Sequence, residues 1–124
     1  MRLYLTLPYP PTVNHYWQTT VKRRGQRFYP HIYIGEKGDN YRRQVKAILS
    51  GVPKLIGPVQ VCIVASPPDK RQRDLDNLLK CLLDSLTKAG LWDDDSQVRS
   101  LTIVWSDGVG GRIKMFAEEM NGLS

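Results

Sequence analysis

The sequence predicts one α+β domain over residues 1–124, with a small, mostly antiparallel sheet of about four strands and two main helices. Three patterns indicate this fold class. Short runs of alternating or β-branched residues predict strands, leucines at helical spacing predict a helix, and Gly and Pro residues separate these segments. A chain of 124 residues buries enough apolar surface for one core without disulfides.

The first half of the chain is predicted to contain one strand and one helix, separated by a basic arm. Residues 2–7 place three leucines on one face of a strand, which prolines then end. Residues 12–35 are aromatic and basic with no clear period, so we expect a long, partly irregular arm. Residues 36–50 place apolar side chains on one face and cations on the other, which predicts a helix ending before Gly51.

The second half is predicted to contain three strands and the most regular helix. Residues 59–65 form a β-branched run between Gly-Pro and Pro-Pro pairs, which is typical of a buried strand. Leucines from Leu75 to Leu86 follow the i, i+3, i+4, i+7 spacing, and Gly90 is well placed to end that helix. Residues 98–105 and 112–118 are predicted as two strands joined by a Gly-rich hairpin loop.

Several classes of protein are excluded by composition. No apolar run approaches the roughly 20 residues of a membrane span, and the start has no signal-peptide core, so we expect a cytoplasmic protein. Cys62 and Cys81 lack metal or redox spacing and are expected to be reduced and structural. His15 and His31 have no matching acid and nucleophile, so no imidazole base is predicted.

The net charge of +6 is unevenly distributed. Residues 1–54 carry ten Lys or Arg and two acids, whereas the remainder carries eight Lys or Arg and ten acids. Seven of the twelve acids lie between Asp69 and Asp95. A positive surface attracts nucleic acid, which a group of carboxylates repels unless a cation lies among them. The pattern therefore indicates metal-assisted chemistry on a phosphate backbone.

Asp74 and Asp76 are the first candidate metal ligands. They flank Leu75 at the start of the leucine helix, and alternate positions in an extended chain place both carboxylates on one side. A helix cap or a first-turn acid is an alternative explanation, although it accounts for one of the two more easily than for both.

A second group of acids, Asp93, Asp94 and Asp95, follows the same helix, where acids are unfavourable with the helix dipole. Two of the three are expected in a solvated loop, and spacing alone does not decide which one turns towards the first pair. Carboxylate ligands favour Mg²⁺, with Mn²⁺ expected to substitute, over Zn²⁺. The chemistry that follows is activation of a water for attack on phosphorus, with one metal or two.

Cations surround the acidic pair in the sequence. Lys80 lies one helical turn after Asp76 and is explained equally by an ordinary ion pair or by a cation beside the scissile phosphate. Lys70, Arg71 and Arg73 precede the acids and can neutralise phosphates, with a solvated turn as the alternative.

The basic arm is the second candidate for DNA binding. Its cations are interleaved with aromatic residues, a combination typical of nucleic-acid contact, although a merely basic loop has the same composition. The cations are Lys22, Arg23, Arg24 and Arg27.

The run RQRDLDNLLKCLLDSLTKAGLWDDDSQV resembles the central motif of the RusA family of Holliday-junction resolvases. That motif is a basic stretch, Asp-x-Asp-Asn, a helix with a Lys one turn on, Ala-Gly, an aromatic residue and Asp-Asp-x-Gln-Val. The opening LTLPYPPTVNHYW also resembles the family's first strand, proline run and Asn. The resemblance spans about the whole chain, and its specific part is residues 69–98.

This resemblance implies a RusA-like fold and a homodimer that nicks two opposed strands of a four-way DNA junction with Mg²⁺ or Mn²⁺. The implied host is a bacterium or its prophage. The family's metal-binding acids fall on Asp74, Asp76 and Asp95, its catalytic lysine on Lys80, and its basic lead-in on Arg71 and Arg73. Asp93 departs from the pattern, because other members often have an uncharged residue there.

Two other functions are also consistent with these residues. One is a non-catalytic module that binds branched DNA through the basic arm, with the acids serving as helix caps. The other is a metal-dependent nuclease acting on flap DNA or RNA.

Overall fold

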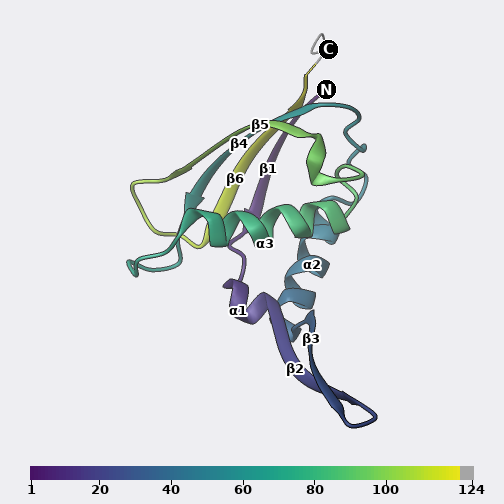
Figure 1. Ribbon diagram of the computed structural model, residues 1–124. Helices are drawn as coiled ribbons and strands as arrows, with labels where there is room; N and C mark the ends of the chain where they lie inside the picture. The colour runs from purple at the N-terminus through teal and green to yellow at the C-terminus, as the bar shows by residue number, and fades with distance from the viewer. Residues whose placement is uncertain (121–124) are drawn as a thin grey trace.

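A four-stranded sheet in the order β1-β6-β4-β5 forms the centre of the structure (Figure 1). The computed structural model describes residues 1–120. β6 is antiparallel to both of its neighbours, whereas β5 runs parallel to β4. The fold is α+β with a mostly antiparallel main sheet, as predicted. Its strands are β1 (Arg2–Pro8), β4 (Val59–Ser66), β5 (Val98–Trp105) and β6 (Arg112–Glu119).

β5 and β6 do not form the predicted hairpin, because β4 lies between them. Ala65 of β4 pairs with Trp105 of β5 on one side and with Ile113 of β6 on the other. A helix connects β4 to β5, and such a crossover brings the second strand back parallel to the first. The Gly-rich loop at 106–111 therefore passes the end of β4 instead of making a tight turn.

α3 (Leu75–Lys88) lies across one face of the sheet and forms the predicted leucine helix (Figure 1). Leu82 and Leu86 are fully buried in the core. The chain leaves the helix through Gly90, whose φ of +87° is the left-handed conformation that glycine adopts at little cost. The second predicted helix, α2 (Glu36–Ile48), packs against α3.

Within residues 1–120, no helix covers the opposite face of the sheet (Figure 1). Residues whose side chains alternate with the buried positions, such as Tyr4, Val64 and Val104, are exposed there. Both cysteines are free, as predicted: Cys81 is buried on α3 and Cys62 is partly buried on β4. None of the helices within residues 1–120 is long and apolar enough to cross a membrane.

The predicted irregular arm is wrong, because residues 17–34 form a regular hairpin that projects from the body (Figure 1). β2 (Trp17–Arg24) and β3 (Arg27–Ile34) pair along their whole length, and Gly25 turns the chain with a φ of +66°. Most side chains on both faces are exposed, so the sequence lacks the apolar–polar alternation that marks a half-buried strand.

The base of the hairpin is fixed to the helices through Tyr16, at the end of α1 (Val13–Tyr16). The Tyr16 side chain is buried, and its hydroxyl hydrogen-bonds Asp84 and, at 2.9 Å, Ser85 Oγ of α3. Arg42 Nη2 of α2 lies 2.7 Å from Asp84 Oδ2. Burial and the bond to Asp84 raise the pKa of Tyr16 to about 12. A Cβ at Gly38 would collide with the Tyr16 carbonyl oxygen, so α2 and α1 are in close backbone contact.

Candidate active site and nucleic-acid interface

Asp74 and Asp76 lie together at the start of α3. Asp74 is the last residue before the helix, its backbone is extended, and its side chain makes no capping hydrogen bond. The partner found for its carboxylate is the Asn77 side chain, with Asp74 Oδ2 3.5 Å from Asn77 Nδ2. Both acids are exposed. The cap explanation is therefore not supported for Asp74, whose carboxylate faces solvent at the helix start.

Asp95 lies near the opposite end of α3. The helix has 14 residues and is about 21 Å long at 1.5 Å per residue. Asp95 begins the short helix η1 (Asp95–Gln97), which leads into β5 where Val98 pairs with Val59 at the start of β4. β5 does fold back along the helix, as expected, but only after Asp95.

A single copy of the chain therefore does not gather Asp74, Asp76 and Asp95. Within residues 1–120, no three His, Cys, Asp or Glu side chains lie close enough to hold a metal ion. The assignment of Asp74, Asp76 and Asp95 as metal ligands stays a prediction.

The three consecutive acids after α3 differ in their contacts. Asp93 Oδ1 accepts a 2.7 Å hydrogen bond from Lys54 Nζ. Asp94 Oδ2 accepts a 2.5 Å bond from Ser96 Oγ, and its backbone N–H donates to the Gln97 side chain. Asp95 is exposed, and among the residues described its carboxylate has no side-chain partner. Asp93 and Asp94 are thus engaged locally, whereas Asp95 is free to bind a ligand.

Arg73 is a cation held in place beside Asp74. Its Nη1 lies 2.7 Å from Asp69 Oδ1, and its guanidinium lies 5.8 Å from the centre of the Tyr9 ring. The hydrogen bond from Arg73, with one from the Arg71 backbone, lowers the pKa of Asp69 to about 2.

The other cations of this region extend into solvent. Lys70 and Arg71 are exposed on the loop before α3, and Lys80 is exposed on α3 itself. The ordinary ion pair considered for Lys80 is not formed: no ion pair joins it to Asp76 in the described part of the chain. Arg71 Nε lies 3.7 Å from Asp69 Oδ2, whereas Lys70 and Lys80 have no ion-pair partner among the residues described.

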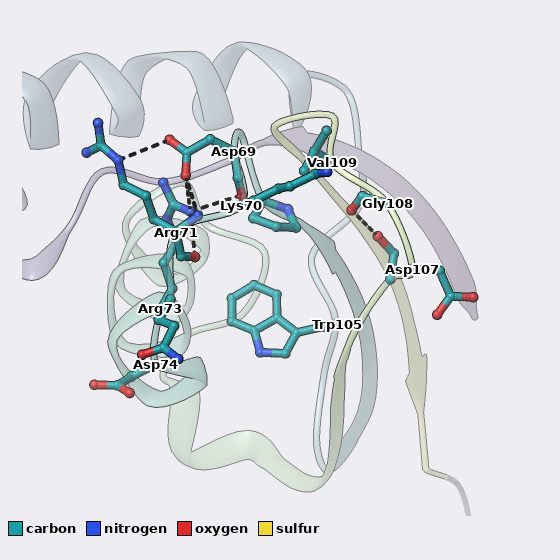
Figure 2. A pocket seen from close by; sticks show the side chains of 12 residues that line it. Asp69, Lys70, Arg71, Arg73, Asp74, Trp105, Asp107, Gly108 and Val109 are labelled. Atoms are coloured by element: carbon teal, nitrogen blue, oxygen red, sulfur yellow. Dashed lines mark hydrogen bonds and ion pairs between the residues drawn. The ribbon is translucent and has the colours of Figure 1, made fainter.

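A cavity of about 800 Å³ lies between this loop and the loop after β5 (Figure 2). Asp69, Lys70, Arg73 and Asp74 line one side, and Trp105 projects into it from β5. Trp105 belongs to no motif in the sequence that points to a functional role. Its position beside Asp74 depends on the parallel pairing of β4 and β5, which follows from a strand order that the sequence does not predict.

The hairpin has two distinct faces, which follow from its register. Arg24 pairs with Arg27 and Lys22 with Tyr29, so these side chains share one face with Tyr33. Side chains at alternate positions form the other face, and its members are Trp17, Thr19, Val21, Arg23, Phe28, Pro30, Ile32 and Ile34. We refer to these as the basic face and the apolar face.

The apolar face carries one of the four arm cations. Arg23 lies on it, with its guanidinium 5.8 Å from the centre of the Phe28 ring. Val21, Phe28 and Ile32 are each between 66% and 69% exposed, which is unusual for large apolar side chains in one patch. Of the four arm cations predicted to bind DNA, three lie on the basic face and Arg23 does not.

An α+β domain with exposed carboxylates at a helix start, flanked by cations and a basic hairpin, has the features of a protein that acts on nucleic acid. The model of the family described as Endodeoxyribonuclease RusA matches residues 8–116. The chain is 39% identical over 118 residues to the crossover junction endodeoxyribonuclease of Enterobacteria phage HK97, covering 92% of each chain.

Two further relatives have the same printed name. The protein of Enterobacteria phage 82 is 40% identical over 121 residues, covering 94% of each chain. The protein of Escherichia coli K12 is 38% identical over 120 residues, covering 94% of this chain and 93% of the relative. The chain belongs to the RusA family, as the resemblance of its central motif predicted.

Proposed function

We propose that this chain is a metal-dependent endodeoxyribonuclease that resolves four-way DNA junctions by paired symmetric nicks. The observation that carries the proposal is the exposed pair Asp74 and Asp76 at the start of α3, in a chain whose relatives are named crossover junction endodeoxyribonucleases. Because these relatives come from phages and enterobacteria, the proposed place of action is the bacterial cytoplasm.

Asp74 and Asp76 fit a magnesium ion by the chemistry of their donors. Mg²⁺ prefers carboxylate oxygens and is commonly held by one or two of them, and both side chains face solvent here. When bound, the ion supplies an activated water and offsets charge on the phosphate. Lys80 lies one turn further along α3 and stabilises negative charge that develops on the same phosphate. Mn²⁺ is expected to substitute, because it prefers the same oxygen ligands.

We propose a homodimer in which the apolar face of the hairpin contacts a second copy. An isolated two-stranded hairpin is marginally stable in water, and this one leaves Val21, Phe28 and Ile32 exposed. A two-fold dimer also suits a junction that is cut at two symmetric positions. Asp95 is too far from Asp74 to share a metal with it in one copy, so the second copy is the source of this third acid.

The basic face of the hairpin and the loop before α3 are proposed to contact the DNA backbone. Lys22, Arg24 and Arg27 supply cations, and Tyr29 and Tyr33 supply exposed aromatic rings on the same face. Lys70 and Arg71 extend the cationic surface to the edge of the proposed active site.

The proposal is tested by incubating the protein with a labelled synthetic four-way junction in Mg²⁺ or in EDTA. Linear duplex, flap DNA and structured RNA of the same length serve as controls. Paired nicks on the junction, seen only with the metal, are the expected result.

Two other outcomes identify the alternatives. Binding without cutting under every metal condition would establish a structure-specific binding module. Preferential cutting of flap DNA or RNA would support a nuclease activity but identify a different substrate.

A further inference from the structure

Trp105 lies at the boundary between the core and the cavity beside Asp74. It pairs with Ala65, so its side chain is on the same face of the sheet as α3. The residue is only partly buried, because part of the ring packs on the core and part faces the cavity (Figure 2). Trp92, by contrast, is 1% exposed and its indole N–H donates to Thr87 Oγ1 at 2.7 Å. Trp105 therefore retains a free aromatic surface.

The walls of this cavity carry charges of both signs. Asp69 pairs with Arg73 at 2.7 Å and with Arg71 at 3.7 Å, and the three acids of the lining, Asp69, Asp74 and Asp107, equal its three cations in number. With no excess of positive charge, the interior does not favour a phosphate. A flat, uncharged ring of a ligand would instead meet the aromatic surface of Trp105. Lys70 and Arg71 are exposed, so they could contact phosphates on either side of such a ring.

We propose that the cavity holds one unpaired nucleobase of the DNA substrate, stacked on the indole ring of Trp105 next to the phosphate at Asp74. This inference rests on the proposed function. It adds a position that binds a base to the acids that are proposed to act on the phosphate. The volume of about 800 Å³ is within the range of pockets that enclose small molecules. Aromatic stacking accepts every base, because each base has a π-face.

Such a position favours branched DNA over linear duplex. A base inside a duplex must unstack and unpair before it reaches Trp105, whereas a base at a branch point has lost part of that stabilisation already. Trp105 is thus a residue that selects the substrate by its structure and not by its sequence.

The test is a double-mutant cycle between protein and DNA, measured as junction binding in EDTA so that cutting is not required. Wild type, Trp105→Ala and Trp105→Phe are titrated against an intact junction and against junctions with one abasic site at each nucleotide flanking the exchange point. We expect Trp105→Ala to weaken binding to the intact junction about tenfold. At one position, the abasic site should weaken junction binding by wild type by a similar factor. The same abasic site should weaken junction binding by Trp105→Ala less than about twofold.

Two controls separate stacking from packing. Trp105→Phe keeps an aromatic ring and should retain most of the affinity for the intact junction. If Trp105→Ala does not fold, the cycle is measured with Trp105→Phe in its place. Tyr4→Ala removes an aromatic ring that is 76% exposed on the opposite face of the sheet and should bind as wild type does.

The inference is overturned if, at every abasic position, the fold-loss in affinity from Trp105→Ala multiplies with the fold-loss from the abasic site. It is also overturned if Trp105→Ala binds the intact junction as tightly as wild type does. If the binding data show the expected coupling between Trp105 and one base but wild type never cuts, the proposed nuclease activity is refuted and the stacking position is kept. A wild type that cuts junctions with multiplicative losses would refute the stacking position alone.

Discussion

At the scale of single residues, the loop before α3 is organised by the pair Arg73 and Asp69. Their 2.7 Å contact places one cation beside Asp74, while Lys70 is exposed and the exposed Arg71 lies 3.7 Å from the same Asp69 carboxylate. The pKa of Asp69 is about 2 in the folded protein, against an ordinary value of 3.8. The ion pair with Arg73 therefore stabilises the fold fully above about pH 4, and this stabilisation is lost as the pH falls through 2. The geometry beside Asp74 is therefore maintained throughout the neutral range.

Replacement of Arg73 by Gln should raise the pKa of Asp69 towards its ordinary value of 3.8, because its main hydrogen-bond donor is removed. The measurement is a carbon NMR titration of the Asp69 carboxyl group in both proteins. Arg2→Gln is the matched control, since Arg2 bonds Glu118 at the far end of β1. An Asp69 pKa that stays near 2 without Arg73 would contradict this account of the loop.

Replacement of Asp76 by Asn should abolish junction cutting and leave junction binding intact or stronger. The change removes one negative charge from the proposed metal ligands while keeping the side-chain shape. Single-turnover cleavage in Mg²⁺ and a binding titration in EDTA measure the two effects separately. Asp39→Asn, on the exposed surface of α2, should cut at the wild-type rate. Wild-type cutting by the Asp76 variant would remove Asp76 from the metal site.

At the scale of elements, the hairpin β2–β3 is proposed to use its two faces for different partners. One face presents Lys22, Arg24 and Arg27 and the other presents Val21, Phe28 and Ile32, and the register alone separates them. Tyr16 ties the base of the hairpin to α2 and α3 through hydrogen bonds with Arg42, Asp84 and Ser85.

Replacement of Ile32 by Glu should convert the proposed homodimer to a monomer, because the charge would enter the proposed apolar contact between copies. Size-exclusion chromatography with light scattering measures the mass. Thr20→Glu is the matched control, since it places the same charge on the basic face, and it should remain dimeric. A dimer that persists in the Ile32 variant would assign the contact to another surface.

Replacement of Arg24 by Gln should weaken binding to all junction sequences alike. If Arg24 neutralises one phosphate, the slope of log K against log salt should become shallower by about 0.9. Arg23→Gln lies next to it in sequence but on the apolar face, so it should change the slope less. Equal effects of the two variants would show that the face of the hairpin does not determine DNA contact.

The elements also show which predictions the sequence supported and why others failed. The leucine helix was predictable because its buried stripe repeats at helical spacing, and the strand at 59–65 because it is buried and β-branched. The hairpin was missed because most side chains on both of its faces are exposed, so no apolar–polar alternation marks its strands. The position of Trp105 depends on strand order, which one-dimensional periodicity does not contain.

At the scale of the whole molecule, the three predicted metal ligands Asp74, Asp76 and Asp95 do not come together in one copy. The positions of Asp74 and Asp76 at the helix start could be predicted from local sequence, and the structure agrees. The distance to Asp95 could not, because it depends on the length and direction of α3 relative to β5. The proposed homodimer solves this problem by placing the Asp95 of one copy beside the Asp74 and Asp76 of the other.

Mixing the inactive variants Asp76→Asn and Asp95→Asn should restore cutting. A mixed dimer then contains one site with every acid intact, whereas no site is intact if all three acids act within one copy. The restored activity should consist of single nicks, since the second site of that dimer carries both substitutions. Nicked and fully resolved junctions are separated on denaturing and native gels. Each variant mixed with itself is the control, and no recovery in the mixture would place the whole site in a single copy.

The position of β6 affects how the protein is made. β6 lies between β1 and β4 and pairs with both, so Arg2 meets its partner Glu118 only after nearly the whole chain exists. Such non-local pairing delays folding until the distant segments are both present. A nascent chain on the ribosome therefore holds its acids and cations on an incomplete sheet until residues 112–119 emerge. The sheet beneath α3 is therefore continuous from β1 to β5 only after β6 has joined it.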